Sequence, residues 1–244
     1  MNRTLEHILP RVQKPARYTG GEYNAVVKDR RAVDVRYALC FPDTYEIGMS
    51  NLGVRILYGL MNEMDGVWCE RVFAPWGDME EEMRREGIPL YGLESGDSIA
   101  DFDLIGFSLG YEMAYTNVLN MLDLAGLPLR SGERTELSPI VVAGGTCAFN
   151  PEPLAPFVDL FVLGEGEDVS VEIIQLYRQA REEGWGKEEF LTAAARIPGV
   201  YVPSLYEVSY HGDGTVAAVT PLEGAPARVT KRIVQDFDKS YFPV

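Results

Sequence analysis

The sequence contains few of the residues on which most catalytic and metal sites depend. Its 244 residues include two histidines, His7 and His211, and three widely spaced cysteines, Cys40, Cys69 and Cys147. An odd number of separated cysteines does not suit a disulfide framework and indicates a reducing cytoplasm. Three such thiols also cannot form a zinc or iron–sulfur site by themselves.

Long apolar runs and phosphate-binding motifs are missing as well. Apolar runs such as those at 139–145 and 158–164 are far too short to cross a bilayer, and residues 1–18 contain no apolar signal-peptide core. No G-x-G-x-x-G motif follows the first apolar run, and no G-K-[ST] occurs, which argues against a nucleotide site. We therefore expect a cytoplasmic protein without a membrane segment.

Positive charge is scarce except at the N-terminus. The net charge of −15 does not suit a general nucleic-acid-binding surface, because phosphate contacts need clustered Lys and Arg. Residues 1–33 are the exception, with seven basic side chains and three acidic ones. The charges favour an arm that packs on the acidic body of its own chain. The other interpretation is a docking surface for another domain or an anionic ligand.

From residue 34 onward, apolar runs alternate with segments of helical periodicity. The pattern predicts strands at 35–41, 67–74, 102–109, 139–145 and 158–164, and helices at 50–64 with Ser50 as N-cap, at 78–87, at 112–126 and at 167–184 with a cap near Asp168. Five alternations predict an α/β fold with a flavodoxin-like, doubly wound, five-stranded parallel sheet in the order 2-1-3-4-5. A short helix at 187–197 and a β-hairpin at 206–221 follow.

These segments divide the chain into three predicted parts. A basic N-terminal arm spans 1–33, a Rossmann-type domain spans 34–184, and a helix plus β-hairpin extension spans 185–244. We find no internal repeat and no low-complexity tract.

Four segments follow predicted strands and should meet at the carboxyl edge of the sheet, where doubly wound folds bind ligands. The candidate cofactor-binding residues in these segments are Asp43, Tyr45, Gly48, Ser108, Leu109, Gly144, Gly145, Gly164 and Glu165. Each segment alone also suits an ordinary turn or the start of a helix. Their order at consecutive strand ends makes a shared ligand site the stronger interpretation. Both histidines lie outside these segments, so no nucleophile–base pair is found and this chain alone is expected to be non-catalytic.

The set of strand-end segments resembles cobalamin-binding domains, whose pattern is D-x-H-x-x-G, then S-x-L, then G-G. Here Asp43 and Gly48 keep the ends of the first element, and Tyr45 stands at the position of the cobalt-ligating histidine. Ser108-Leu109 approximates the second element without its spacer residue, and Gly144-Gly145 matches the third.

A closer resemblance is to the N-terminal region of cobalamin-binding-type radical S-adenosylmethionine proteins, and in particular to one uncharacterised bacterial branch. It covers essentially the whole chain, and DLIGFSLGYEMAYTNVLNMLDLAG and PIVVAGGTCAFNPEPLAPFVDLFVLGEGE are its most specific stretches. The resemblance implies an excised N-terminal piece of a larger enzyme. The C-x-x-x-C-x-x-C motif, with its [4Fe–4S] cluster and S-adenosylmethionine, would lie in a radical SAM domain beyond Val244, the expected partner of this chain.

The resemblance leaves two interpretations of the Tyr45 segment open. A phenol needs deprotonation from a pKa of about 10 to bind a metal, whereas a neutral imidazole does not. The segment therefore either holds cobalamin with no protein ligand below the cobalt, or belongs to a degenerate scaffold in which Tyr45 fills the place of the corrin. Such a scaffold would dock substrate or the partner domain.

Overall fold

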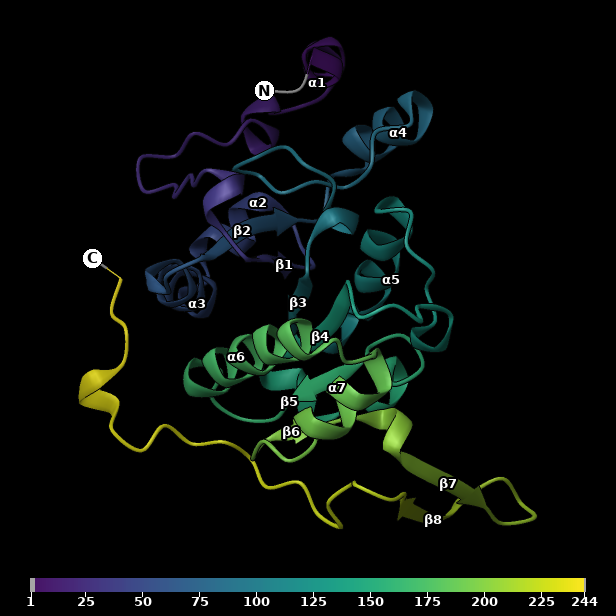
Figure 1. The fold of residues 1–244 in the computed structure, drawn as a ribbon. Helices are drawn as coiled ribbons and strands as arrows, with labels where there is room; N and C mark the ends of the chain where they lie inside the picture. Colours follow the sequence, from purple (N-terminus) through teal and green to yellow (C-terminus); the bar gives the residue numbers. More distant parts are fainter. Residues whose placement is uncertain (1–2, 244) are drawn as a thin grey trace.

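The computed structural model describes residues 3–243, and a six-stranded sheet forms its centre (Figure 1). Its strands are β1 (Val35–Phe41), β2 (Val67–Phe73), β3 (Leu104–Ser108), β4 (Ile140–Gly144), β5 (Leu160–Val162) and β6 (Val200–Tyr201), in the spatial order β2-β1-β3-β4-β5-β6. Strands β1 to β5 run parallel, which confirms the α/β fold and the predicted order of five strands. Residues 1, 2 and 244, at the ends of the predicted arm and extension, lie outside the described residues.

The predicted number of strands was wrong by one. Strand β6 pairs antiparallel with β5 through Phe161↔Tyr201 and Val162↔Val200. Two residues are too few to show an alternating pattern, so the sequence contains no periodic signal for this edge strand.

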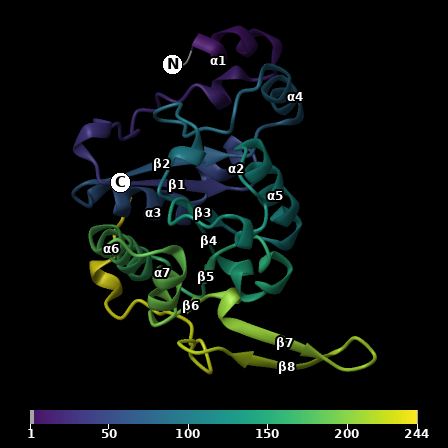
Figure 2. The same cartoon turned by 45° about the vertical axis from the view of Figure 1, so that its right-hand side comes forward.

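Helices cover both faces of the sheet (Figure 2). The helices α3 (Leu52–Glu63), α6 (Glu167–Glu183) and α7 (Lys187–Ala194) pack on one face, and α1 (Arg3–Ile8), α4 (Gly77–Glu86) and α5 (Tyr115–Leu124) pack on the other. Strand β1 is buried along its whole length. Its Tyr37 and Leu39 belong to the core beneath α3, α6 and α7, and its Ala38 and Cys40 belong to the core beneath α1, α4 and α5. A parallel strand covered on both faces reads as a continuous apolar run, which explains the clear sequence signal.

Two helix boundaries differ from the prediction. The segment between the predicted strand at 35–41 and the predicted helix at 50–64 contains a short helix, α2 (Tyr45–Ser50), that the pattern did not predict. Asn51 rather than Ser50 caps α3, because its side-chain oxygen accepts a hydrogen bond from the Val54 amide at 3.0 Å. Both residue types are good N-caps, so the pattern alone could not choose between neighbours. Helix α6 begins at Glu167 and has Asp168 in its first turn.

The N-terminal arm packs on the body of the chain. Its buried side chains Leu5, Ile8, Val12 and Tyr18 join the core on the α4–α5 face. Its ion pairs connect Arg11 to Glu82 and Glu86, Lys14 and Arg17 to Glu46, and Arg30 to Asp97. This is the arrangement that the charge distribution favoured.

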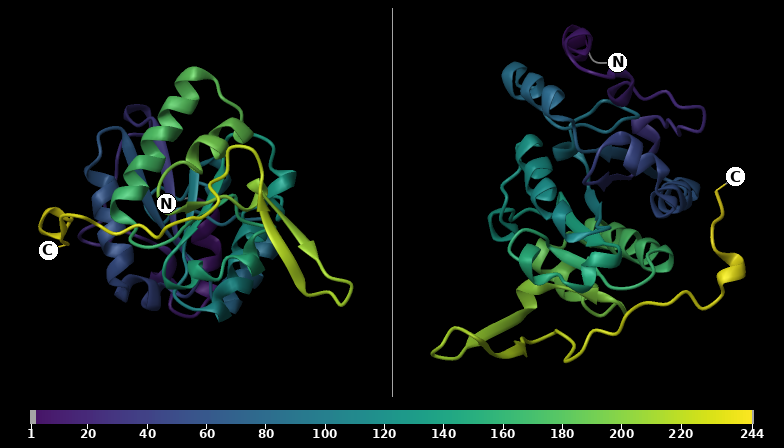
Figure 3. Two further views of the ribbon diagram at one scale, coloured as in Figure 1. Left: turned by 90° about the horizontal axis from the view of Figure 1, so that it is seen from below. Right: turned by 180° about the vertical axis from the view of Figure 1, so that it is seen from behind.

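The C-terminal part begins with the predicted hairpin and continues as an extended strap. Strands β7 (Tyr206–Tyr210) and β8 (Val216–Pro221) pair antiparallel and project from the body (Figure 3). Residues 222–243, here called the strap, then run past β6 and α6 towards α3. The Arg232 amide donates to the Leu163 carbonyl at 2.7 Å, and the Tyr241 ring lies against Gly59 of α3.

Candidate functional site

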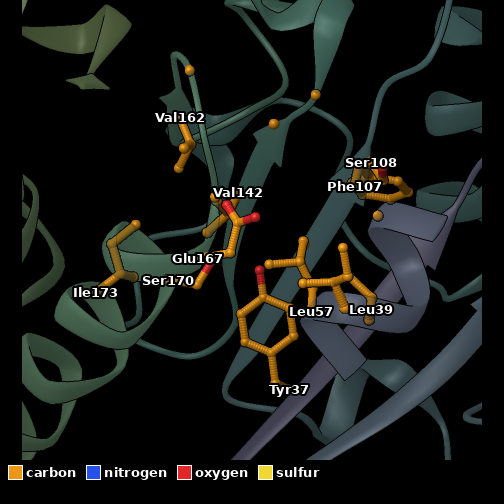
Figure 4. A pocket seen from close by; sticks show the side chains of 17 residues that line it. Tyr37, Leu39, Leu57, Phe107, Ser108, Val142, Val162, Glu167, Ser170 and Ile173 are labelled. Carbon is orange, nitrogen blue, oxygen red and sulfur yellow. The ribbon is translucent and has the colours of Figure 1, made fainter. Parts of the chain in front are cut away.

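The candidate site is a groove between α3 and α6, above the carboxyl half of the sheet (Figure 4). It encloses about 820 Å³ of space, its open mouth included. It lies beside β1 and β3, at the point where the strand order reverses: the helix after β1 packs on one face and the helix after β3 packs on the other. This is the position at which doubly wound sheets bind ligands. Its apolar walls include Leu39, Leu57, Val142, Val162 and Ile173.

A buried tyrosine points into the groove from its floor. Tyr37 of β1 is 5% exposed, and its hydroxyl lies over Gly106 of β3, where an added Cβ would be 1.9 Å away. Only a glycine at position 106 leaves room for this ring. In the part of the chain that the structure describes, no group forms a hydrogen bond with the Tyr37 hydroxyl. Burial raises the pKa of Tyr37, so the phenol stays protonated and can donate a hydrogen bond.

Three more polar side chains line the same groove. Ser108 ends β3, and Glu167 and Ser170 belong to the first turns of α6. Ser170 is 8% exposed, and Figure 4 shows the Glu167 carboxylate directed into the cavity. Within residues 3–243 none of the three side chains has a hydrogen-bond partner. Tyr37 and Ser170 are buried, whereas Ser108 and Glu167 are partly exposed. Polar side chains that line an apolar groove without protein partners mark a place where a ligand can supply partners.

Four of the nine predicted site residues line the groove. These are Ser108, Gly144, Gly145 and Gly164. Gly145 has a φ of 100°, and an added Cβ there would be 2.6 Å from the Leu109 carbonyl oxygen. The backbones of the segments after β3 and β4 therefore touch each other at the groove.

Two other predicted residues of these segments point elsewhere. Leu109 is buried in the core of the opposite face. The Glu165 amide donates to the Arg232 carbonyl at 3.1 Å, and the Glu165 carboxylate accepts from the Val234 amide. Glu165 therefore holds the strap, and its neighbour Glu167 faces the groove.

The first predicted segment does not reach the groove. Tyr45 of α2 donates a hydrogen bond to Glu22 of the arm at 2.8 Å, and its ring packs edge-on against Phe73. Burial and the hydrogen bond to Glu22 raise the pKa of Tyr45 to about 12. Gly48 faces the Phe73 ring, where an added Cβ would be 2.2 Å away. The structure thus places Tyr45 and Gly48 against the arm and β2.

Asp43 has a different phenol as its partner. Its carboxylate accepts hydrogen bonds from the Thr44 amide at 2.7 Å and from the hydroxyl of Tyr111. Tyr111 lies in the segment after β3, so this pair joins the first and third strand ends. The hydrogen bond to Asp43, helped by burial, raises the pKa of Tyr111.

Sequence reasoning missed Tyr37, Tyr111, Glu167 and Ser170. Tyr37 sits inside an apolar strand and looks like a core residue, although the glycine at 106 on a neighbouring strand was a signal of close approach. Glu167 and Ser170 resemble ordinary first-turn residues of a helix. Only the folded arrangement shows that these side chains face one cavity.

Ser108 stands in the sequence Gly106-Phe-Ser-Leu-Gly110, which matches the G-x-S-x-G pattern of serine hydrolases. Such a serine needs a histidine base within hydrogen-bond reach. His7 belongs to α1 and His211 to the hairpin turn, and neither lines the groove. Among residues 3–243, Ser108 thus has no histidine beside it to act as such a base.

Over residues 3–243, no three His, Cys, Asp or Glu side chains gather in a way that could hold a metal ion. No helix in the described chain is long and apolar enough to span a membrane. The cysteines Cys40 and Cys69 are free and fully buried, as small apolar side chains of the core.

Comparisons with known proteins give one family and one relative. The family described as "Radical SAM proteins, N-terminal" matches residues 53–203. The uncharacterised protein MJ0966 of Methanocaldococcus jannaschii is 28% identical over 140 residues, which are 56% of this chain and 26% of that protein. The matched part is thus about a quarter of that relative's length. No solved structure matches the chain. The family match includes Ser108, Gly144, Gly145 and Gly164, and it begins after Gly48.

Proposed function

The chain belongs to the family of radical SAM protein N-terminal regions, and we propose that it is the module that binds a cobalamin-type cofactor for such an enzyme. The catalytic [4Fe–4S] cluster and S-adenosylmethionine are then bound by a radical SAM domain of the same polypeptide. In this proposal the module works in the cytoplasm and performs no catalysis alone.

The groove is the observation on which the proposal rests. It combines apolar walls with four unpaired polar side chains, at the ligand position of a doubly wound sheet. Gly144 leaves the rim without a side chain, since an added Cβ there would meet only Val162, at 3.5 Å, whereas the strap covers Gly164. A bulky group on the carboxyl edge can therefore extend a narrow tail past Gly144, between α3 and α6. A corrin ring with a nucleotide tail has this shape.

The residues of the groove fit the tail of such a cofactor, whereas Tyr45 does not fit the role of a cobalt ligand. Ser108, Gly144, Gly145 and Gly164 would hold its tail, and Tyr37 would close the inner end of the groove. Tyr45 faces Glu22, so it does not stand below a group on the carboxyl edge. A bound corrinoid supplies a cobalt centre for group transfer or radical chemistry, and the protein would provide no ligand from position 45. The chain's own task is to position that group and to shield it from water.

The basic arm has a defined part in this proposal. Arg17 and Lys14 fix α2 through Glu46, and Glu22 fixes Tyr45, so the arm sets the position of the first strand end. We propose that residues 1–33 act as this brace, 34–184 as the cofactor-binding domain, and 185–244 as the connection to the radical SAM domain.

A second candidate function is a scaffold that docks the partner domain without a cofactor. The observation that favours it is an apolar rim: large apolar side chains of the strand-end segments are exposed at Ile47, Leu52, Trp76, Tyr111, Met113 and Phe149. Exposed apolar side chains gathered on one edge mark an interaction surface. Under the first proposal the same rim faces the cofactor and the radical SAM domain together.

Titration of the chain with hydroxocobalamin, followed by absorbance, tests the proposal. We expect saturable binding that Gly144→Leu abolishes, because the added side chain extends into the groove. Gly77→Leu is the matched control, since an added Cβ on Gly77 of α4 meets no atom within 4 Å. Lack of binding by the parent chain would overturn the cofactor proposal in favour of the scaffold. Binding that Gly144→Leu leaves intact would contradict the groove as its site.

A separate measurement tests whether the iron–sulfur cluster is bound by another domain and not by this chain. After anaerobic reconstitution with iron and sulfide, the chain should produce no 5′-deoxyadenosine from S-adenosylmethionine. Stoichiometric production would contradict the assignment of the cluster to another domain.

A further inference from the structure

The inner end of the groove has a hydrogen-bonding pattern that restricts its ligand. Tyr37 offers a hydroxyl from β1, and Ser170 and Glu167 offer a hydroxyl and a carboxylate from α6; none has a partner in the described chain. Ser108 ends β3, four residues beyond Leu104, the partner of Tyr37, and its hydroxyl belongs to the mouth of the groove. A ligand that leaves a buried donor or acceptor unpaired loses the free energy of desolvating it. The ligand end that fits is therefore one with complementary polar atoms.

The type of each group fixes what the ligand must present. A carboxylate only accepts hydrogen bonds, so Glu167 requires an N–H or O–H donor on the ligand. The Tyr37 phenol stays protonated because burial raises its pKa, so it can donate to a ligand acceptor. Serine hydroxyls adapt to either need. The ligand end should hence contain both a donor and an acceptor.

The apolar walls of the groove and the charge of its lining side chains restrict the chemical class of the ligand further. The walls next to these groups are apolar, with Leu39 and Val142 on the sheet and Leu57 and Ile173 on the helices. No Lys, Arg or His lines the groove among residues 3–243, and Glu167 would repel an anion. A phosphate or carboxylate group thus stays outside. A flat nitrogen heterocycle suits the slot.

We propose that the groove recognises a purine-type base, through Tyr37, Glu167 and Ser170, in preference to the methylated benzimidazole of cobalamin. The inference rests on the proposed function in that it places a cofactor tail in this groove. Dimethylbenzimidazole presents two methyl groups and no N–H donor at its outer edge, so it would leave Glu167 and the hydroxyls unpaired. An adenine base presents an amino group to the carboxylate and ring nitrogens to Tyr37 and Ser170.

Titration calorimetry with three corrinoids tests this inference. The probes are a corrinoid with adenine as its lower base, cobalamin with dimethylbenzimidazole, and cobinamide, which has no base. We expect the adenine corrinoid to bind about tenfold more tightly than cobalamin, the effect of about one buried hydrogen bond. Tyr37→Phe should remove this preference, so that the ratio of the affinities for the adenine corrinoid and for cobalamin falls to about one. Tyr91→Phe is the matched control, because the Tyr91 hydroxyl donates to the Tyr18 carbonyl at 3.1 Å, away from the groove.

The outcomes separate this inference from the proposed function. Equal affinity for all three corrinoids would refute the base recognition and support a corrinoid site elsewhere on the edge. Binding of free adenosine that Tyr37→Phe weakens, with no corrinoid binding, would support the groove's specificity and refute the cobalamin-type cofactor. Absence of binding by adenosine and by every corrinoid would overturn both. A preference that Tyr37→Phe leaves intact would refute the assignment to Tyr37.

Discussion

The substitution Gly106→Ala should close the groove from its floor. The added Cβ would lie 1.9 Å from the Tyr37 hydroxyl oxygen and 2.6 Å from the Cζ atom of the same ring. Real Cβ atoms essentially never come within 3.0 Å of a heavy atom, so the ring must move by more than 1 Å. Strand β1 fixes the base of the side chain, and the open direction is the groove. The ring should therefore swing into the space that a ligand would occupy.

The stability change is the balance of two effects. Overpacking a core costs about 1–3 kcal/mol, and exchanging a strand glycine for alanine returns about 0.5–1 kcal/mol of backbone entropy. The groove gives the ring somewhere to go, which favours the lower part of the range. We expect a net loss of about 0.5–1 kcal/mol, or about 1–4 °C in Tm for a chain of this size.

Two assays on the same protein measure the two effects. Chemical denaturation should show the modest loss of stability, and corrinoid or adenosine titration should show a loss of affinity much greater than tenfold. Gly77→Ala is the control, since it adds a methyl group in open space on α4. The double variant Gly106→Ala/Tyr37→Leu has no ring for the added methyl group to displace. Its loss of stability should therefore be about 1 kcal/mol smaller than the sum of the losses measured for the two single variants. Additive costs, or a Gly106→Ala variant with full stability and full affinity, would refute this reasoning.

Three further outcomes are expected. Tyr45→His should leave the absorbance spectrum of a bound corrinoid unchanged, which an absorbance titration can check. It should lower the free energy of unfolding by about 1 kcal/mol, measured by urea denaturation, because the phenol hydrogen bond is lost. A spectrum typical of histidine-coordinated cobalt would contradict the placement of Tyr45. The Arg17 hydrogen bond lowers the pKa of Glu46 to about 2 from 4.5, so the contribution of this ion pair to holding the arm should be fully present above about pH 4.5 and be lost as the pH falls through about 2. Glu46→Gln should remove this part of the pH dependence in proteolysis or hydrogen exchange of residues 14–17. Gly164→Ala should release the strap, because Gly164 has a φ of 110° and an added Cβ would lie 2.2 Å from the Arg232 carbonyl oxygen; proteolysis of residues 222–243 should become faster, and an unchanged rate would contradict the contact.

The sheet was predictable because its central strands are buried on both faces. Such strands appear as apolar runs, and the amphipathic helices between them imply right-handed crossovers and therefore the strand order. Strand β6 was not predictable, since two residues at an edge show no period. The same limit applies to α2, where six residues after a strand end look like a loop until Gly48 is seen packed against Phe73.

The site was predictable only where backbone geometry defines it. Ser108 and Gly144 end strands and Gly164 follows one, so topology alone brings them to one edge. The polar groups inside the groove depend on side-chain direction. Tyr37 and Ala38 are neighbours in one apolar run, and only the strand pleat sends the first towards the groove and the second towards the opposite core.

The first strand end shows how a motif can keep its place and change its chemistry. Asp43 stands where a cobalamin-type pattern has its aspartate, but its hydrogen-bond partner is Tyr111 from the segment after β3. This pair ties two strand ends together and presents a phenol, rather than an imidazole, at the carboxyl edge. The hydrogen bond to Asp43 raises the pKa of Tyr111, so the phenol stays protonated and its hydroxyl remains available to donate to Asp43. A planar group on this edge would therefore be held from its rim and tail, by the apolar side chains around it and by the α3–α6 groove. In the proposed function, this chain would position the cofactor through these contacts and leave the chemistry to the radical SAM domain.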